Sequence, residues 1–236
     1  MTTTQPAPHE LWDPAAIAPN IDHIVTEDDA PVDNIFSEKQ QRLLTEPLYS
    51  SWPGPGNDRV FMVAANVGVF AAVYQPPLVP DVFLSLDVQV PEDMWAKNHR
   101  SYFLWEYGKP PDVVIEIVSN QKGHEAGSKL RDYARIGVTY YLIFDPEEQL
   151  QGKTLRLYAL REAKYVPMKS QWLPEVGLGV ALWQGSFEGT EAMWLRWCDQ
   201  AGNIIPTGAE RAEQERERAE RLAARLRALG VDPEDV

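Results

Sequence analysis

This chain of 236 residues is poor in cysteine, in long apolar runs and in basic residues, and each shortage excludes a class of protein. Cys198 is the single cysteine, so an internal disulfide and a cysteine-based zinc site are both excluded. No apolar run approaches the roughly 20 residues that a membrane-spanning helix needs. Residues Met1–Glu10 lack the basic flank and apolar stretch of a secretory signal. We therefore expect a cytoplasmic protein with no membrane association.

The charge is strongly acidic and unevenly distributed. The chain has 22 Lys and Arg residues against 35 Asp and Glu residues, which gives a formal net charge of −13. Such a protein is a poor general binder of polyanions, because Lys and Arg drive the neutralisation of phosphates. Residues 97–135 are the exception, with seven bases and five acids. Any nucleic-acid activity must therefore rest on a local basic face, and the alternative is an acidic protein with one patch of mixed charge.

Composition divides the chain into three parts. Residues 1–30 are rich in Pro, Ala and acids with little periodicity, which predicts an N-terminal arm. Residues 31–206 contain the helix and strand patterns of a folded domain. Residues 207–236 form a charged tail that is rich in Glu, Arg and Ala.

The first half of the domain predicts one helix followed by strands. The helix is expected from Ser37, as its cap, to about Trp52, because Leu43, Leu44 and Leu48 have helical spacing. Strands are expected at 60–65, 67–74 and 82–90, and a long loop at 91–111.

A strand, a helix and a second strand follow in the middle of the chain. Val113–Val118 is apolar on both faces, as in a buried central strand. A helix is predicted at 125–136, closed by Gly137, and a second buried strand at 138–144. This order indicates an α/β unit in which the helix crosses over the sheet. Short antiparallel strands are expected at 155–160, 164–167 and 193–198.

The segment Ala209–Leu229 has neither Gly nor Pro and predicts a helix. Its apolar residues follow alternating three- and four-residue spacing, interrupted by Glu215, so the helix could self-associate. An exposed helix stabilised by ion pairs between residues four apart is the alternative.

Glu116 is the first candidate for chemistry, because it interrupts the buried strand Val113–Val118. Burying a carboxylate costs several kcal/mol unless it is paired or binds a metal. Glu116 is therefore either half of a structural ion pair or a ligand of a hard divalent cation such as Mg²⁺.

A second acid, Asp81, supports the metal hypothesis. It follows Pro80 and opens the strand expected at 82–90. If that strand lies antiparallel to the strand of Glu116, the two carboxylates could reach one ion. Asp112 also follows a proline, but it lies about 13 Å from Glu116 along an extended strand. We expect Asp112 to order a loop or to cap.

Several of these segments together resemble a known family. The segments are PDVVIEIVS at 111–119, KLRDYARIGVTYY at 129–141, Asp145-Pro146 and, upstream, VPDV at 79–82. This ordered set resembles the bacterial Uma-two family of restriction endonuclease-like proteins, within the PD-(D/E)XK nuclease superfamily. The resemblance covers about residues 37–206.

The resemblance implies an α/β fold: a PD-(D/E)XK nuclease-like mixed sheet flanked by helices, with added antiparallel strands and a charged C-terminal helix. It implies Mg²⁺, with Mn²⁺ as a substitute, DNA as the partner, and hydrolysis of phosphodiester bonds. Asp81, Glu116 and the backbone carbonyl of Ile117 would be the metal ligands. The superfamily's lysine position, two residues after the glutamate, is Val118 here, and the family takes its lysine from the next helix, which is Lys129.

Other roles stay open at this point. Lys129 could instead be a solvated partner of Glu125, with Lys122 as the reserve lysine. Ser119 could cap the helix or touch a phosphate. A further acid near the metal could come from Glu38 or Glu46, although both fit exposed positions. Three functions remain: a DNA endonuclease, an inactive nuclease-fold binding module, and an assembly protein that forms a homodimer through 209–229.

Overall fold

The structure is a computed structural model that describes residues 20–24, 34–56, 59–119, 125–150, 152–229 and 232. The predicted N-terminal arm lies mostly outside these described residues. Among the described residues, no helix has both the length and the apolar character needed to cross a membrane.

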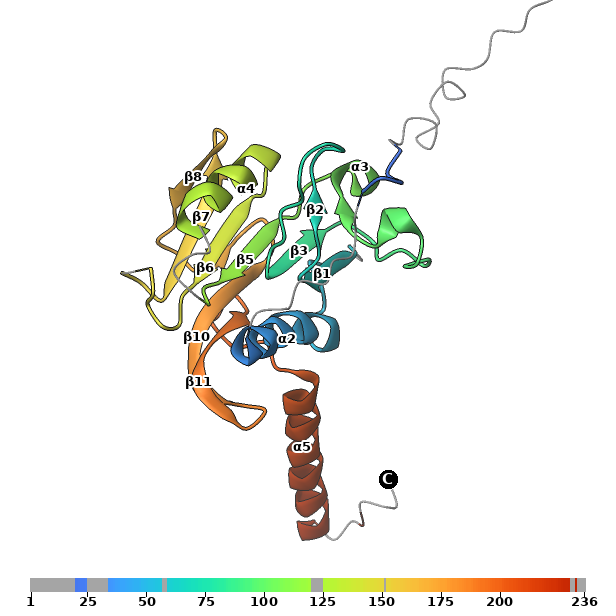
Figure 1. The fold of residues 1–236 in the computed structure, drawn as a ribbon. Coiled ribbons are helices and arrows are strands. Elements are labelled where there is room, and N and C mark those ends of the chain that lie inside the picture. The colour runs from blue at the N-terminus through green and yellow to red at the C-terminus, as the bar shows by residue number, and fades with distance from the viewer. Residues whose placement is uncertain are drawn as a thin grey trace, which may run out of the picture.

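A six-stranded mixed sheet forms the centre of the protein, in the order β1-β3-β5-β6-β7-β8 (Figure 1). The strands are β1 (Phe61–Ala65), β3 (Val82–Leu86), β5 (Val113–Ile117), β6 (Tyr140–Phe144), β7 (Leu155–Arg161) and β8 (Lys164–Pro167). Only the β5–β6 pair is parallel; the other neighbours are antiparallel. This is the mixed sheet that the sequence predicts.

The β5–β6 connection is the predicted crossover. All residues of β5 and β6 are buried, which explains their apolar, β-branched and aromatic composition. Between them, a π-helical turn at Glu125–Lys129 leads into α4 (Leu130–Ile136). Gly137 ends the helix with φ 92°, a left-handed conformation that glycine adopts without a side-chain penalty.

Two smaller sheets accompany the central one. A three-stranded antiparallel sheet contains β9 (Trp172–Leu173), β10 (Leu178–Phe187) and β11 (Thr190–Cys198). The strands β2 (Val69–Phe70) and β4 (Tyr102–Phe103) form a short parallel pair, and α3 (Leu104–Tyr107) follows β4 directly. A 3₁₀ turn at Lys97–His99 precedes β4. The expected loop at 91–111 therefore contains short regular elements.

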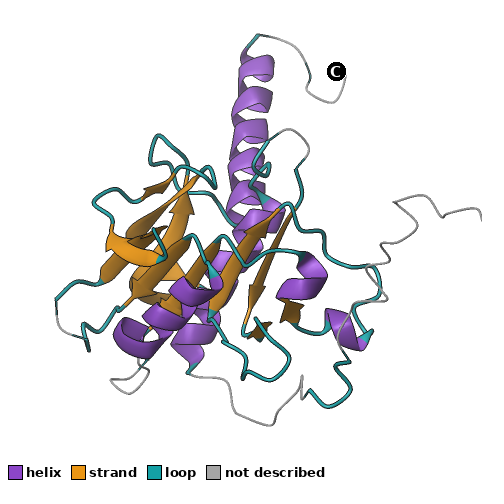
Figure 2. Ribbon diagram, turned by 90° about the horizontal axis from the view of Figure 1, so that it is seen from above, coloured by secondary structure: helices purple, strands orange, loops and turns teal. Residues whose placement is uncertain are grey.

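Helices flank the strands of the central sheet (Figure 2), and its middle strands β3, β5 and β6 are fully buried. On one face, α2 (Ile35–Ser50) and the β9–β11 sheet pack against Leu84, Ile115 and Leu142. On the opposite face, Tyr133 of α4 packs against Val114. Because side chains alternate along a strand, odd and even residues of β5 enter different cores.

Several predicted boundaries are wrong, and three of them have a local reason. The helix α2 begins at Ile35, because Asn34 is its cap and accepts a hydrogen bond from the Ser37 amide. The strand β3 ends at Leu86, because the next residue, Asp87, has a φ of 59°. The strand expected at 67–74 shrinks to β2, which is followed by bends and turns. The 10-residue strand β10 is absent from the sequence-based expectations.

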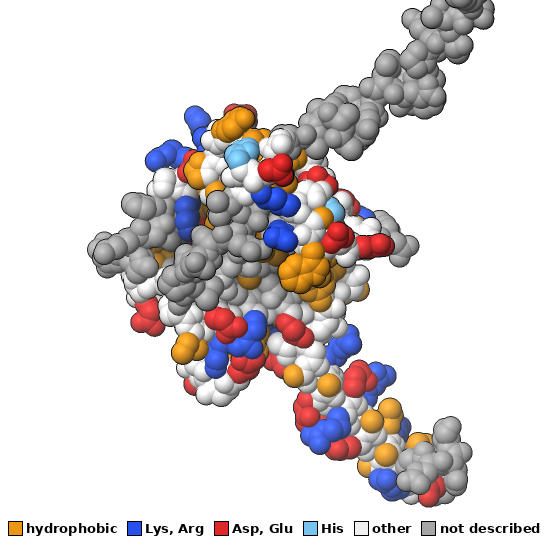
Figure 3. All heavy atoms as spheres, turned by 45° about the vertical axis from the view of Figure 1, so that its right-hand side comes forward, with side chains coloured by type: hydrophobic (Ala, Val, Ile, Leu, Met, Phe, Trp, Pro, Cys, Tyr) orange, Lys and Arg blue, Asp and Glu red, His pale blue; other side chains and the backbone are white. Residues whose placement is uncertain are grey.

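The helix α5 (Gly208–Ala228) confirms the predicted C-terminal helix and extends away from the sheet (Figure 1). Thr207 and Glu210 form a capping box at its start. No residue of α5 is buried, and its surface alternates acidic, basic and apolar side chains (Figure 3). Ion pairs such as Glu213–Arg216 and Glu217–Arg221 link successive turns.

Candidate active site

Asp81 and Glu116 lie on adjacent strands and on the same face of the sheet. The strands β3 and β5 are antiparallel with Val82 opposite Ile115, so continuing this register by one residue sets Asp81 opposite Glu116. Residues directly opposite one another point to the same face. That face is the one that α4 covers, because Val114 and Val118 of the same parity contact Tyr133. The sequence predicts that the two carboxylates can meet if these two strands are antiparallel, and the structure pairs them in that way.

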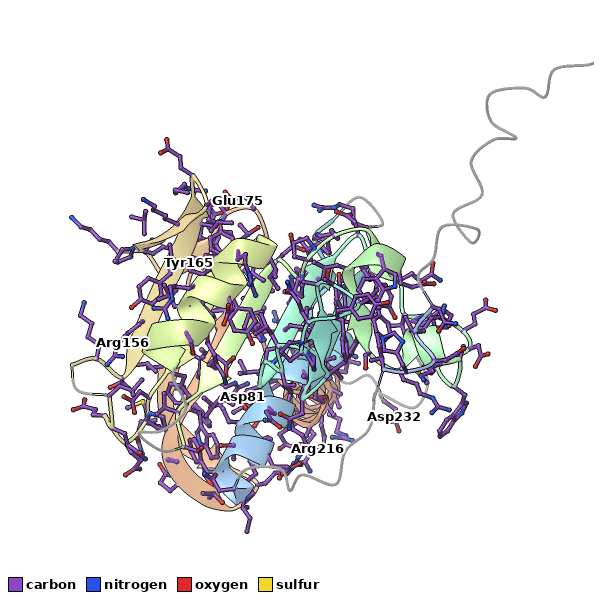
Figure 4. All side chains as sticks on the ribbon, turned by 45° about the horizontal axis from the view of Figure 1, so that its top comes forward. Asp81, Arg156, Tyr165, Glu175, Arg216 and Asp232 are labelled. Carbon is purple, nitrogen blue, oxygen red and sulfur yellow. The ribbon has the colours of Figure 1, made fainter. Side chains whose placement is uncertain are left out.

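Asp81 is fixed by two elements. Its Oδ2 accepts a hydrogen bond of 2.6 Å from the backbone amide of Ile117, and its Oδ1 accepts one of 3.3 Å from Nε2 of Gln41 on α2. Figure 4 shows Asp81 close to α2. Gln41 is itself held by Asn66, whose Nδ2 donates to its Oε1 at 2.9 Å. The carboxylate therefore joins β3, β5 and α2 at one point.

Glu116 receives two hydrogen bonds from the helical segment above the sheet. Lys129 Nζ donates to its Oε2 at 2.7 Å, and the Tyr133 hydroxyl donates to its Oε1 at 2.8 Å. These donors are four residues apart, and residues at that spacing lie on one face of a helix. The predicted helix therefore turns Lys129 toward the sheet and not out into solvent.

Burial and charge set the ionisation of Glu116, which is only 1% exposed. Burial raises the pKa of its carboxyl to about 8; the Lys129 ammonium opposes this rise, and the nearby Asp81 carboxylate adds to it. The same environment raises the pKa of Tyr133 well above its usual value, first through burial and then through the charge of Glu116. Tyr133 therefore remains a proton donor to Glu116.

Val118 occupies the superfamily's usual lysine position and has no polar role. Its side chain is buried in the core beneath α4, and its amide donates to the Phe144 carbonyl at 2.8 Å. The ammonium group near Glu116 comes instead from Lys129, thirteen residues further along the chain.

The structure places the remaining candidates away from the Asp81–Glu116 pair. Asp112 accepts a hydrogen bond of 2.7 Å from the Leu86 amide and pairs with Lys109, so it orders a loop at the other end of β5. Glu38 is exposed and pairs with Arg42. Glu46 is also exposed, and its Oε1 accepts from the Gly208 amide at the start of α5. Both acids thus have other partners in the structure, and a role for Glu38 or Glu46 near a metal stays a prediction.

Two candidates lie close to the end of β5 in the sequence. The backbone carbonyl of Ser119 accepts a hydrogen bond of 3.3 Å from Nε2 of Gln149. Lys122 falls in residues 120–124, outside the described part of the chain.

Sequence reasoning missed Gln41 and Tyr133. For Tyr133 the signal was available, because it lies one helical turn after Lys129 on the same side. Gln41 had a weaker signal: it is a polar residue beside Leu43 and Leu44 in the apolar part of α2, where the structure buries it. Its partner lies 40 residues away, so no local spacing could have identified it.

The donor chemistry fits a hard divalent cation. The Asp81 and Glu116 carboxylates repel one another at this buried position, which is part of why the pKa of Glu116 rises. A cation between them would relieve that repulsion, and carboxylate and carbonyl oxygens are the ligands that Mg²⁺ prefers. Among the described residues, no group of three or more His, Cys, Asp or Glu side chains could hold a metal ion. Further ligands must therefore come from backbone, water or substrate oxygens.

The mixed sheet, its crossover helix and the added antiparallel strands define a protein of the PD-(D/E)XK nuclease-like class. The chain matches the family Uma2, described as "Putative restriction endonuclease", over residues 26–184. Because the match spans more than half of the chain, this protein belongs to that family, which indicates a nuclease. No curated protein matches the chain.

Proposed function

We propose that this protein is a Mg²⁺-dependent endonuclease that hydrolyses phosphodiester bonds of DNA, with Mn²⁺ as a substitute for Mg²⁺. The observation that carries the proposal is the convergence of Asp81, Glu116 and Lys129, from β3, β5 and the crossover segment, at one buried point. Membership of a restriction endonuclease-like family supports it.

Asp81, Glu116 and the backbone carbonyl of Ile117 would hold the cation. The hydrogen bond from the Ile117 amide orients Asp81, and the Tyr133 hydroxyl orients Glu116. When bound, the cation would polarise the scissile phosphate and lower the pKa of the attacking water.

Lys129 would act on the reacting groups through its ammonium. In the metal-free protein this ammonium donates a hydrogen bond to Glu116. Once the carboxylate is engaged elsewhere, the ammonium can donate to the attacking water or to a phosphate oxygen, where negative charge develops. Because its side chain is 31% exposed, it lies between the buried acids and solvent.

The test is cleavage of plasmid DNA with Mg²⁺, with Mn²⁺ and with EDTA. We expect the wild-type protein to cut only with metal, and Asp81→Asn and Glu116→Gln to be inactive while folded. Glu191→Ala removes an exposed acid on β11 and is the matched control. Absence of cleavage by the wild-type protein under all metal conditions would contradict the proposal.

One observation favours a second candidate, a nuclease-fold protein that binds nucleic acid without cutting it. Val118 stands at the usual lysine position, and the ion pair with Lys129 already compensates Glu116 as a structural pair would. This candidate predicts DNA binding that persists in EDTA and is never followed by cleavage.

Assembly through α5 is a separate proposal. Leu222 and Leu229 are 54% and 72% exposed on a helix with no buried residue, so their burial against a second copy would remove apolar surface from water. A homodimer would supply two active sites for two DNA strands.

A further inference from the structure

A pocket of about 380 Å³ lies beside the candidate active site, on the same face of the sheet. Its floor contains Met62, Ala64 and Phe83, from β1 and β3. Tyr102 and Tyr107, whose rings stack at 4.6 Å, form an aromatic wall. The volume is within the range of pockets that bind small organic groups.

Two chain segments connect this pocket with the candidate active site. Phe83 is two residues after Asp81 on β3, so both side chains point to the same face about 7 Å apart. Val67 also lines the pocket, and it follows Asn66 in the chain. The Asn66 backbone amide donates to the Asp81 carbonyl at 3.2 Å, and the Asn66 side chain donates to Gln41. A ligand in the pocket would therefore lie next to the carboxylate pair.

The lining has the chemistry that a nucleobase requires. Tyr107 is partly exposed and offers a flat aromatic ring that can stack on a base regardless of its identity. His99, Arg100 and Ser101 add an imidazole, a guanidinium and a hydroxyl to the mostly apolar lining, and such groups can bond to the polar edge of a base. Arg100 also belongs to the 97–135 segment, which has an excess of positive charge in an acidic chain.

We propose that this pocket binds a nucleobase of the DNA substrate, that of a nucleotide adjacent to the phosphodiester bond held at Asp81 and Glu116. The proposal rests on the proposed nuclease function and adds to it a position for the base. A base that enters this pocket would leave the duplex stack to lie on the sheet face beside Tyr107. The pocket would thereby fix the position of the scissile bond along the strand.

Binding of isolated deoxynucleosides tests the pocket without any cleavage. The metal-free protein is titrated with deoxyadenosine, deoxyguanosine, deoxycytidine and thymidine, and binding is followed by saturation-transfer NMR. We expect saturation transfer to base protons, with an affinity that changes little between low and high salt, because no phosphate takes part. Deoxyribose 5-phosphate, which has no base, should not bind.

Two pocket variants and one control complete the test. Ala64→Leu fills the floor and Tyr107→Leu removes an aromatic wall; each should weaken nucleoside binding about tenfold or more. Ala228→Leu, on the exposed end of α5, should leave it unchanged. Circular dichroism verifies folding. Nucleoside binding that is undetectable in the wild-type protein, or unaffected by both pocket variants, would overturn the proposal. Asp81→Asn should abolish cleavage yet keep nucleoside binding, so failure of the nuclease function and of the pocket are distinguishable.

Discussion

Lys129 Nζ lies 2.7 Å from Oε2 of Glu116, although the two residues are thirteen positions apart and belong to different elements. The crossover between β5 and β6 makes this contact, because it returns the chain over the sheet face that carries Glu116. The superfamily's lysine usually belongs to the same strand as the glutamate. Here the lysine next to the glutamate comes from the helical segment between β5 and β6.

Removing the lysine should separate metal binding from catalysis. We expect Lys129→Ala to lower the cleavage rate about 10²-fold or more, the cost of losing a donor to developing charge. Its affinity for Mn²⁺ should be kept or increased, because the ammonium that competes for Glu116 is gone. Cleavage assays and calorimetric titration measure the two effects. Lys164→Ala, on exposed β8, is the control, and an unchanged rate in Lys129→Ala would exclude this role.

The hydroxyl of Tyr133 should contribute to stability. Tyr133→Phe removes the donor to Oε1 of Glu116 and leaves a buried carboxylate with one partner fewer. The free energy of unfolding should fall by about 1 kcal/mol, the typical loss for one hydrogen bond. Urea denaturation provides the measurement. An equal loss in the double variant Tyr133→Phe/Glu116→Ala, which has no acceptor for the hydroxyl, relative to Glu116→Ala alone, would show that the hydroxyl acts elsewhere.

The raised pKa of Glu116 gives the metal-free protein a defined pH dependence. The pKa is about 8 in the folded state, above the ordinary glutamate value of 4.5, so the folded state binds the proton more tightly than the unfolded state. This group's contribution to stability is therefore fully present below about 4.5 and is lost as the pH rises toward about 8.

Comparison with Glu116→Gln isolates this contribution. In EDTA, the free energy of unfolding of the wild-type protein minus that of the variant should decrease from pH 5 to pH 8, and then level off. Because a divalent cation competes with the same proton, its apparent affinity should increase over this interval. A difference that does not vary with pH would show that Glu116 is ionised throughout.

The first residues of α5 contribute to the stability of the folded domain. Arg196 is buried on β11 and pairs with Glu210 at 2.6 Å, and Gly208 donates to Glu46 of α2. A chain that ends at residue 206 loses Glu210, so the buried Arg196 guanidinium has no carboxylate partner. We expect the free energy of unfolding to fall by about 1–2 kcal/mol, since solvent screens part of the cost.

A chain that ends at residue 211 keeps Glu210 and should unfold like the full chain. It therefore tests assembly without disturbing the fold. If α5 forms a dimer, sedimentation velocity should show concentration-dependent association of the full chain and a monomer for the shortened chain. A full chain that stays monomeric at high concentration would refute assembly through α5.

The sequence predicted best those elements whose pattern is local. The β5–α4–β6 unit follows from two apolar strands and a closing Gly137, and the opposition of Asp81 and Glu116 follows once β3 and β5 are antiparallel. The strand β10 was missed because Gly179 and Gly185 interrupt its apolar pattern and weaken the strand signal. Its pairing with β11, not its own composition, makes it a strand.

Contacts between distant segments could not be predicted in the same way. The partnership of Gln41 with Asp81 depends on how α2 crosses the sheet, and the pairing of Glu46 with Gly208 depends on where α5 begins. Both are tertiary contacts of polar residues that look exposed in the sequence. Glu38 and Glu46 were accordingly considered as acids near a metal, whereas the contact of α2 with Asp81 is made by the Gln41 carboxamide.

Calorimetric titration of the purified protein with Mn²⁺ at pH 8 shows directly whether Asp81 and Glu116 hold a divalent cation. We expect binding to one site formed by Asp81 and Glu116, abolished in Asp81→Asn and in Glu116→Gln and unchanged in Glu191→Ala. Folded variants that bind Mn²⁺ as the wild-type protein does, or a wild-type protein that binds none, would contradict it.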